Sequence, residues 1–385
     1  MEPHATVCPS VFRLCLHHIG NTFRSPSPWR SNNLAALGHG WRTSGTEVTQ
    51  LSNRGENSRG ALKVRASNKL SPHVRLGRDV VRRYALLFAW ALVIVVFGVL
   101  RPEAFWSLEN LSTVLGTQAV LLFLALVSLP AFVAGEYDLS IAGNLSFSLV
   151  LFGFLNVIQH WPLLPSAFVV LASGLVIGLI NSLLIVGTGV PSLIVTLGMG
   201  TALGGLAVAV NAQTTGGVSE TLVSLARTQV LGLPLAFFYA LALTVSLWYF
   251  LVFTPTGRHL YFVGSGREVA RLTGIRVNGL RVGVFLFSGV GASVAGLILA
   301  GSLGATDPNV GPSYLLPVFA AVFLGSTAIQ PGRFNAWGTF AAVYFLVTGI
   351  TGLQLVGLSG WVSDVFYGGS LAIAVTLSQL ASKGD

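Results

Sequence analysis

Long apolar runs, separated by short polar segments, dominate the chain from about residue 82 to its end. Most runs approach the roughly 20 apolar residues that an α-helix needs to cross the hydrocarbon core of a bilayer. The pattern predicts ten spans, at about residues 82–100, 111–134, 139–158, 166–187, 191–211, 232–253, 281–303, 315–329, 336–357 and 361–381. The second, third and eighth runs carry the weakest signals, so the expected fold is an all-α polytopic membrane protein with eight to ten transmembrane helices.

The composition strengthens this prediction. Of the 385 residues, 53% are hydrophobic and only 9% are charged, whereas roughly 25% are charged in soluble domains. A water-soluble fold of this length could not bury so much apolar surface. The composition therefore excludes an ordinary soluble domain.

The positive charge of the chain is concentrated near its N-terminus. Residues 1–83 hold 13 Lys/Arg and 4 Asp/Glu, an excess of nine, whereas residues 84–385 hold nine of each. Residues 1–75 are polar and basic, so we expect a disordered extension ahead of a transmembrane domain at 76–385. Three interpretations of the extension remain open: a start codon assigned too early, a genuine cytoplasmic tail, and an organellar transit peptide. Since the spans carry no net charge, the sequence gives no indication of nucleic-acid binding.

The remaining arginines and lysines predict how the spans are oriented. With ten spans and a cytoplasmic N-terminus, nine basic residues fall on the cytoplasmic side and only Arg101 and Arg227 on the other. Cytoplasmic loops carry an excess of Lys and Arg. Both termini are therefore expected in the cytoplasm.

One charged segment interrupts the apolar pattern at residues 257–275, GRHLYFVGSGREVARLTGI. Ser265 and Glu268 have the spacing of a capping box, in which the serine caps a helical amide and the glutamate bonds back to the serine backbone. Gly274 stands where a left-handed residue commonly ends a helix. The segment therefore predicts a short helix over 266–273 with its own start and stop signals.

The predicted helix has two chemically different faces. Val269 and Leu272 share one face, and Arg267 and Arg271 share another, because residues three or four apart are neighbours on a helix. Ile275 is expected to close over the last turn. Short helices are marginal in water, so the caps favour a helix whose shape is kept for a partner's groove. An ordinary solvated loop that follows the charge rule remains the alternative.

Acidic residues between the second and third spans are the other candidates for chemistry. Glu136 and Asp138 are flanked by apolar runs, and an ionisable group at membrane depth is a functional candidate. The break also resembles the discontinuous helices that line transport pathways. The alternative is that Asp138 caps the following helix from a short turn.

Several segments, in order, resemble the permease subunits of bacterial ABC importers for simple sugars. They include GEYDLSIAG at 135–143, NSLLI from Asn181, PSLIVTLG at 191–198, YLLPVFAAVFLGST at 314–327 and PGRFNAWGT at 331–339. In the charged segment, the matching positions are Gly257, Arg258, Gly264, Ala270, Gly274 and Ile275. The resemblance covers about residues 75–382. It departs from the family at Gly266, where asparagine is usual, and near Leu315, where an acidic residue is missing.

The resemblance implies a transport subunit of the inner membrane of a bacterium. Its expected partners are a separate ABC ATPase, a second permease chain in a homo- or heterodimer, an extracytoplasmic sugar-binding protein and the lipid bilayer. The ATPase would grip the short helix, and the residues expected there are Gly257, Arg258, Ser265, Arg267, Glu268, Ala270, Arg271, Leu272, Gly274 and Ile275. The candidates for the translocation pathway are Asp138, Ser140, Asn144, Asn181 and Thr196, although such polar residues also serve as hydrogen-bond partners between spans.

ATP binding by this chain is not expected. A G-x-x-x-x-G-K-[ST] loop is needed for that chemistry, and the only lysines are Lys63, Lys69 and Lys383, none after such a glycine run. We therefore predict no cofactor on this chain, and ATP used by the partner. The alternatives are a permease for nucleosides or branched-chain amino acids, and an ATP-independent secondary transporter or channel. An integral-membrane enzyme is disfavoured because His160 and His259 are far apart in the sequence and form no clustered site.

Overall fold

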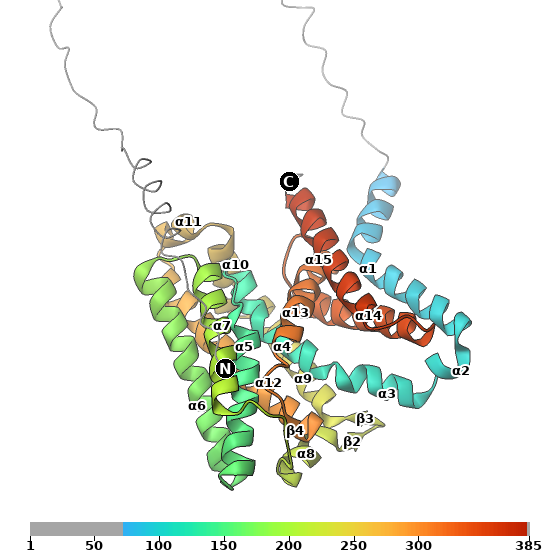
Figure 1. Ribbon diagram of the computed structural model, residues 1–385. Helices are drawn as coiled ribbons and strands as arrows, with labels where there is room; N and C mark the ends of the chain where they lie inside the picture. Colours follow the sequence, from blue (N-terminus) through green and yellow to red (C-terminus); the bar gives the residue numbers. More distant parts are fainter. Residues whose placement is uncertain (1–71, 383–385) are drawn as a thin grey trace, which may run out of the picture. The chain divides into compact units, whose positions relative to one another are not determined.

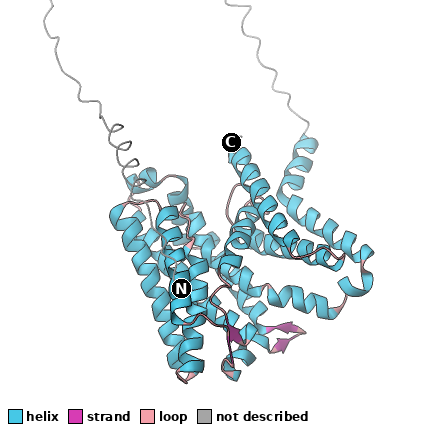
Figure 2. Cartoon of the chain, viewed as in Figure 1, coloured by secondary structure: helices cyan, strands magenta, loops and turns pink. Residues whose placement is uncertain are grey.

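The computed structural model describes residues 72–382, which are almost entirely helical (Figures 1 and 2). The extension expected at 1–75 falls outside these residues but for its last four. The helices are α1 (Pro72–Leu100), α2 (Pro102–Phe105), α3 (Leu108–Thr117), α4 (Ala119–Val133), α5 (Ser140–Gly153), α6 (Leu163–Ser182), α7 (Ser192–Val210), α8 (Glu220–Arg227), α9 (Leu235–Phe253), α10 (Pro255–Ser265), α11 (Arg267–Leu272), α12 (Val277–Leu303), α13 (Pro312–Gly325), α14 (Ala336–Leu355) and α15 (Trp361–Ser382). Short π-helical stretches, η1 (Phe154–Ile158) and η2 (Leu183–Gly187), continue α5 and α6.

Eight stretches of the described chain are long and apolar enough to cross a membrane. They are Arg83–Leu100, Leu108–Val133, Ser140–Ile158, Leu163–Gly187, Ser192–Val210, Leu235–Phe253, Val277–Leu303 and Ala336–Leu355. These agree with eight of the ten predicted spans to within a few residues. The predicted span at 315–329 corresponds to the shorter apolar helix α13, and the last predicted span corresponds to α15. The all-α polytopic fold is therefore confirmed.

Helix α4 forms the centre of the core. Nearly every residue from Ala119 to Val133 is buried, which explains why this run is apolar on all sides rather than amphipathic. It packs against α9, α12, α13 and α14. At one end, Phe132 lies in edge or tilted contact with Tyr137, Phe319 and Phe323, with ring centroids 5.0–5.5 Å apart.

Glycines allow two pairs of spans to approach closely. At the α6–α12 crossing, a methyl group on Gly178 would lie 2.5 Å from the carbonyl oxygen of Phe285, and one on Gly289 would overlap the Gly174 carbonyl. At the α5–α7 crossing, Gly143 packs directly on Gly200. Small residues favour such close packing of membrane helices. Gly204, four residues after Gly200, meets open space in contrast, whereas Gly174 and Gly178, which have the same spacing, both pack closely on α12.

The strands in the described part of the chain are two-residue antiparallel pairs that close connections between helices. β1 (Thr215–Gly216) pairs with β4 (Ala305–Thr306), and β2 (Gln229–Val230) pairs with β3 (Leu233–Pro234). The β1–β4 pair joins the segment after α7 to the segment after α12. These small features were not predicted from the sequence.

Candidate functional site

The charged segment between the sixth and seventh predicted spans folds as two helices, α10 and α11. Helix α10 follows α9 after a single residue, Thr254, whose side chain accepts a hydrogen bond of 3.1 Å from the amide of Gly257. Pro255 occupies the first helical position, where its missing N–H costs nothing. No helix was predicted from the sequence over residues 255–265. The Thr254–Pro255 pair, a capping residue followed by a proline, was the signal that could have identified α10.

The predicted capping box at Ser265 and Glu268 is wrong. Ser265 is the last residue of α10, and its hydroxyl donates to the carbonyl of Tyr261 at 2.9 Å. Gly266 is the N-cap of α11, with no side-chain cap bond. The physical reason is that Ser265 belongs to the preceding helix, so its hydroxyl bonds back one turn instead of forward. Glu268 pairs with Arg271 at 3.3 Å on the exposed surface.

The predicted end of the short helix is confirmed. Gly274 has a φ of +84°, in the left-handed region. Its amide donates to the carbonyl of Arg271 at 3.1 Å, and the amide of Ile275 donates to the carbonyl of Ala270 at 3.2 Å. These two bonds are those of the Schellman motif. Ile275 also packs on a small cluster that contains the fully buried Ala270, as predicted.

Helix α11 contacts the connection between α4 and α5 through an ion pair with a buried carboxylate. Glu136 is 1% exposed and forms ion pairs with Arg267 of α11, at 2.9 Å, and with Arg281 of α12. The Arg267 guanidinium also donates to the carbonyl of Gly135 at 3.0 Å. The predicted coupling residue Arg267 therefore does not share a free face with Arg271. The role of Glu136 and Arg281 was missed because 145 residues separate them.

The apolar face of α11 points away from the bundle. The exposed fractions of Val269 and Leu272 are 58% and 87%, respectively, whereas Ala270 on the opposite side is fully buried. Leaving two large apolar side chains in water is unfavourable by roughly 1.5–3 kcal/mol each relative to full burial. Helix α11 thus presents an apolar pair for which the described part of the chain supplies no cover.

Three other residues predicted for this segment differ in their packing and exposure. Gly257 packs against α9, where a methyl group would lie 2.6 Å from Leu251 Cα. Arg258 is exposed, with its guanidinium 3.5 Å from the carbonyl of Phe253. Arg271 is exposed and pairs only with Glu268 among the described residues. The structure therefore brings the predicted residues together around α10 and α11, and their role in coupling stays a prediction.

Tyr261 ties α10 to the connection before α14. Its hydroxyl donates to the carbonyl of Phe334 at 2.5 Å, and burial raises the pKa of the phenol, against an opposing effect of Arg333. We expect Tyr261→Phe to lower the free energy of unfolding by about 0.5–1.5 kcal/mol, the usual net value of one hydrogen bond. Chemical unfolding in mild detergent would measure this. Tyr249→Phe, at an exposed residue of α9, is the control, and equal losses in the two variants would contradict the assignment.

Asp138 lies at the start of α5 and is 1% exposed. One carboxylate oxygen accepts the Ser140 amide at 3.0 Å and the Ser140 hydroxyl at 2.5 Å, and the other accepts the Ser288 hydroxyl of α12. Burial raises the pKa of this carboxyl, and the serine hydrogen bonds lower it. Asp138 therefore accepts the first amide of α5, as the capping alternative expected, although the N-cap residue of that helix is Leu139. The charge is also favoured there by the α5 N-terminus.

The other predicted pathway residues connect helices to one another. The Asn144 amide donates to the Gly289 carbonyl of α12 at 2.8 Å, and the Asn181 amide donates to the Ser140 hydroxyl at 2.8 Å. Thr196 accepts the Leu139 amide at 3.0 Å. All of these side chains are buried. They hold α5 against α6, α7 and α12, and a contact with a transported solute remains a prediction.

A groove of about 430 Å³ lies beside this polar cluster, between α5, α7 and the segment that leads into α13. Glycines from α5 and α7 form much of its wall: Gly143, Gly200, Gly204 and Gly205. Its polar groups come from Ser146, Thr201 and Asn309. Sequence reasoning did not identify this groove, because its wall is made of small residues rather than of polar ones.

A bundle of apolar spans with an exposed, internally anchored helix pair and a groove along two spans has the features of a membrane transport permease. The family described as branched-chain amino acid transport system, permease component, matches residues 110–375. Since the match covers more than half of the chain, the chain belongs to this family. It is an integral membrane protein of the permease class, and the resemblance noted from the sequence is confirmed.

Characterised relatives cover most of the chain. The D-allose transport system permease protein of Escherichia coli K12 is 26% identical over 302 residues, which are 78% of this chain and 93% of that protein. The autoinducer 2 import system permease proteins of Photorhabdus temperata and Salmonella paratyphi A are 27% and 28% identical over 311 and 308 residues, and cover 77% and 76% of this chain and 92% and 91% of their own lengths. No solved structure matches the chain.

Proposed function

We propose that this chain is the membrane-spanning permease subunit of an ATP-driven importer for a simple sugar. The relatives transport D-allose or autoinducer 2, and the chain covers more than nine-tenths of their lengths. The observation that carries the coupling part of the proposal is α11, which exposes Val269 and Leu272 to the outside while Arg267 anchors it to Glu136. A short helix that exposes an apolar face, and that is held to the bundle by an ion pair on its other side, is suited to bind in the groove of a partner protein.

In this proposal the ATPase is a separate protein that grips α10 and α11. Helix α10 joins α9 through Thr254, and α11 joins α12 through the short segment after Gly274. A push on α11 therefore reaches both spans directly, and it reaches the α4–α5 connection through Glu136. The ATPase would use ATP, and this chain would bind no cofactor.

The groove between α5 and α7 is the proposed wall of the translocation pathway. Leu197 of α7, which is 52% exposed, lines this groove together with the glycines. A second permease chain facing this side would complete the pathway, and an extracytoplasmic binding protein would deliver the sugar. The basic residues around α10 and α11 favour a cytoplasmic position for this end of a bacterial inner-membrane protein, and we expect both termini on the same side.

Replacement of Leu272 by aspartate tests the coupling. We expect Leu272→Asp to weaken binding of the ATPase subunit by at least tenfold, because truncating a buried apolar anchor of an interface costs about 2 kcal/mol and each 1.4 kcal/mol is about tenfold. Transport in proteoliposomes and ATPase activity stimulated by the binding protein should fall together. Titration of the ATPase onto the permease in nanodiscs measures the affinity.

The matched control is Leu231→Asp, at a leucine that is 92% exposed in the β2–β3 turn. This variant should bind the ATPase like the unchanged protein. Unaltered ATPase binding and sugar uptake in Leu272→Asp would remove α11 from the coupling interface. Concentration of sugar by the isolated chain with an ion gradient alone would contradict the larger proposal.

A further inference from the structure

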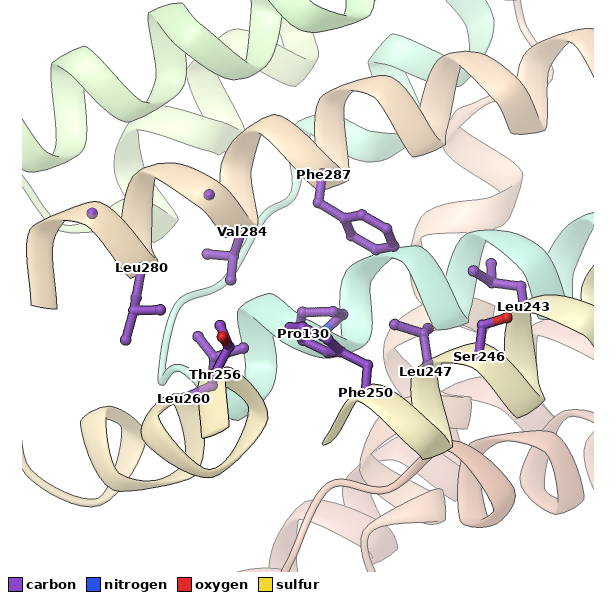
Figure 3. A pocket seen from close by; sticks show the side chains of 12 residues that line it. Pro130, Leu243, Ser246, Leu247, Phe250, Thr256, Leu260, Leu280, Val284 and Phe287 are labelled. Atoms are coloured by element: carbon purple, nitrogen blue, oxygen red, sulfur yellow. The ribbon is translucent and has the colours of Figure 1, made fainter. Parts of the chain in front are cut away.

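An apolar cavity of about 520 Å³ lies between α4, α9, α10 and α12 (Figure 3). Leu247 and Phe250 of α9 face Val284 and Phe287 of α12 across it, with Pro130 of α4 between them. The volume falls within the roughly 300–1,000 Å³ of ordinary ligand pockets. None of the predicted pathway residues lines this cavity, so it is distinct from the groove between α5 and α7.

The surroundings of the cavity determine which occupant is available. Phe287 of its wall is 38% exposed, and the neighbouring α9 residues Trp248, Tyr249 and Phe253 are 38–59% exposed. In a membrane-spanning protein such apolar outer surfaces face acyl chains. Because both its wall and its rim are apolar, the cavity suits hydrocarbon rather than water or sugar.

Two arginines, which do not line the cavity, stand close in sequence to the residues at its α10 end. The hydroxyl-bearing Thr256 lies at the α10 end (Figure 3). Arg258 reaches the carbonyl of Phe253 at the end of α9, and Arg276 precedes α12, three residues before the cavity-lining Gly279. Both arginines are exposed and, among the described residues, neither forms an ion pair with an acidic side chain. An apolar cavity can hold an acyl chain, and exposed arginines near it can bind a negatively charged head group.

We propose that this cavity binds an acyl chain of an anionic phospholipid, whose head group lies against Arg258 and Arg276. The choice of the cytoplasmic leaflet rests on the proposed function, which places α10 on that side. Basic sites between spans on the cytoplasmic side are suited to anionic head groups. The bound chain would fill the space between α9 and α12, the two spans that flank α10 and α11.

Lipid retention by the full chain tests the site. The protein is extracted into mild detergent from membranes that contain phosphatidylglycerol and phosphatidylethanolamine, and native mass spectrometry then reports the lipid that stays bound. We expect a retained phosphatidylglycerol, and its loss in Gly283→Leu. The first carbon of a side chain at Gly283 meets nothing within 4 Å, and Gly283 lines the cavity, so the leucine would take up space in it. Arg258→Ala/Arg276→Ala should abolish the preference for phosphatidylglycerol over phosphatidylethanolamine.

Two controls separate this site from nonspecific lipid. Gly369→Leu places the same side chain in open space on α15, and Arg101→Ala removes an exposed arginine near the other end of a span; both should retain phosphatidylglycerol. No retained lipid in the unchanged protein, or equal retention in Gly283→Leu, would overturn the proposal. A cross-link from a photoreactive group at Ser246 to another protein chain instead of to lipid would also overturn it. The readout involves neither ATPase nor transport, so a failure of coupling alone would leave the lipid site intact.

Discussion

Glu136→Gln is expected to lower the free energy of unfolding by about 3–5 kcal/mol, the largest loss among the substitutions considered. The change keeps the shape of the side chain but removes the charge that compensates Arg281, whose side chain is only 11% exposed. A buried ion pair that loses one partner leaves an uncompensated buried charge, which is strongly unfavourable. Denaturant unfolding in mild detergent, followed by tryptophan fluorescence, measures the loss.

Two further variants show whether charge compensation is the cause. Glu268→Gln removes a carboxylate that is 83% exposed and pairs only with Arg271 among the described residues, so its cost should stay below about 1 kcal/mol. Glu136→Gln combined with Arg281→Met should recover most of the stability, because a buried pair replaced by uncharged groups is often neutral. A double variant as unstable as Glu136→Gln alone would show that the charge of Arg281 is not the source of the loss.

Gly289→Val is expected to give the second large loss, about 3 kcal/mol, at the top of the usual range for overpacking. Any side chain at Gly289 meets the backbone of α6, with the Gly178 Cα only 3.0 Å from the first added carbon. Backbone atoms cannot rotate away as a side chain can, so the α6–α12 crossing would have to open. The Asn144 hydrogen bond to the Gly289 carbonyl would be disturbed as well. Denaturant unfolding of the isolated chain again gives the value.

The control for this crossing is Gly204→Val, at a glycine of α7 that lies four residues after Gly200. A first side-chain carbon at Gly204 meets nothing within 4 Å, and valine has a slightly higher helix propensity than glycine, so the variant should lose almost no stability. If the two valine variants lost equal stability, close contact between backbones would not explain the glycine at 289.

The spans could be predicted because their signal is local. A run of about 20 apolar residues has few other stable arrangements, and eight of the ten predicted spans appear at nearly the predicted positions. The end of α11 was also predictable, since Gly274 and Ile275 are specified by neighbouring residues. One limit appears in the second span, where the apolar run divides into α3 and α4 at Gln118 without a strong sequence signal.

The candidate site was harder to predict because its contacts join distant segments. Ser265 and Glu268 have the spacing of a capping box, but Ser265 is the last residue of α10 and its hydroxyl donates to a carbonyl of that helix. The local pattern therefore led to a wrong assignment. The pairing of Glu136 with Arg267 and Arg281 depends on how α4, α5 and α12 pack. The charge rule counted Arg281 only as one of the cytoplasmic basic residues and gave no sign of its burial. Local pattern and composition carry no information on such pairings.

The unequal burial of the two arginines at Glu136 makes the attachment of α11 easy to reverse. If α11 moved away, Arg281 would still neutralise the carboxylate, whereas the Arg267 side chain, already 42% exposed, would return to water. The loss of the Arg267–Glu136 pair alone would then cost less than the loss of a pair whose two partners are both buried. Dissolved ions screen exposed charges more than buried ones. Higher ionic strength should therefore weaken the ion pair between Arg267 and Glu136. The buried pair between Arg281 and Glu136 should be much less affected.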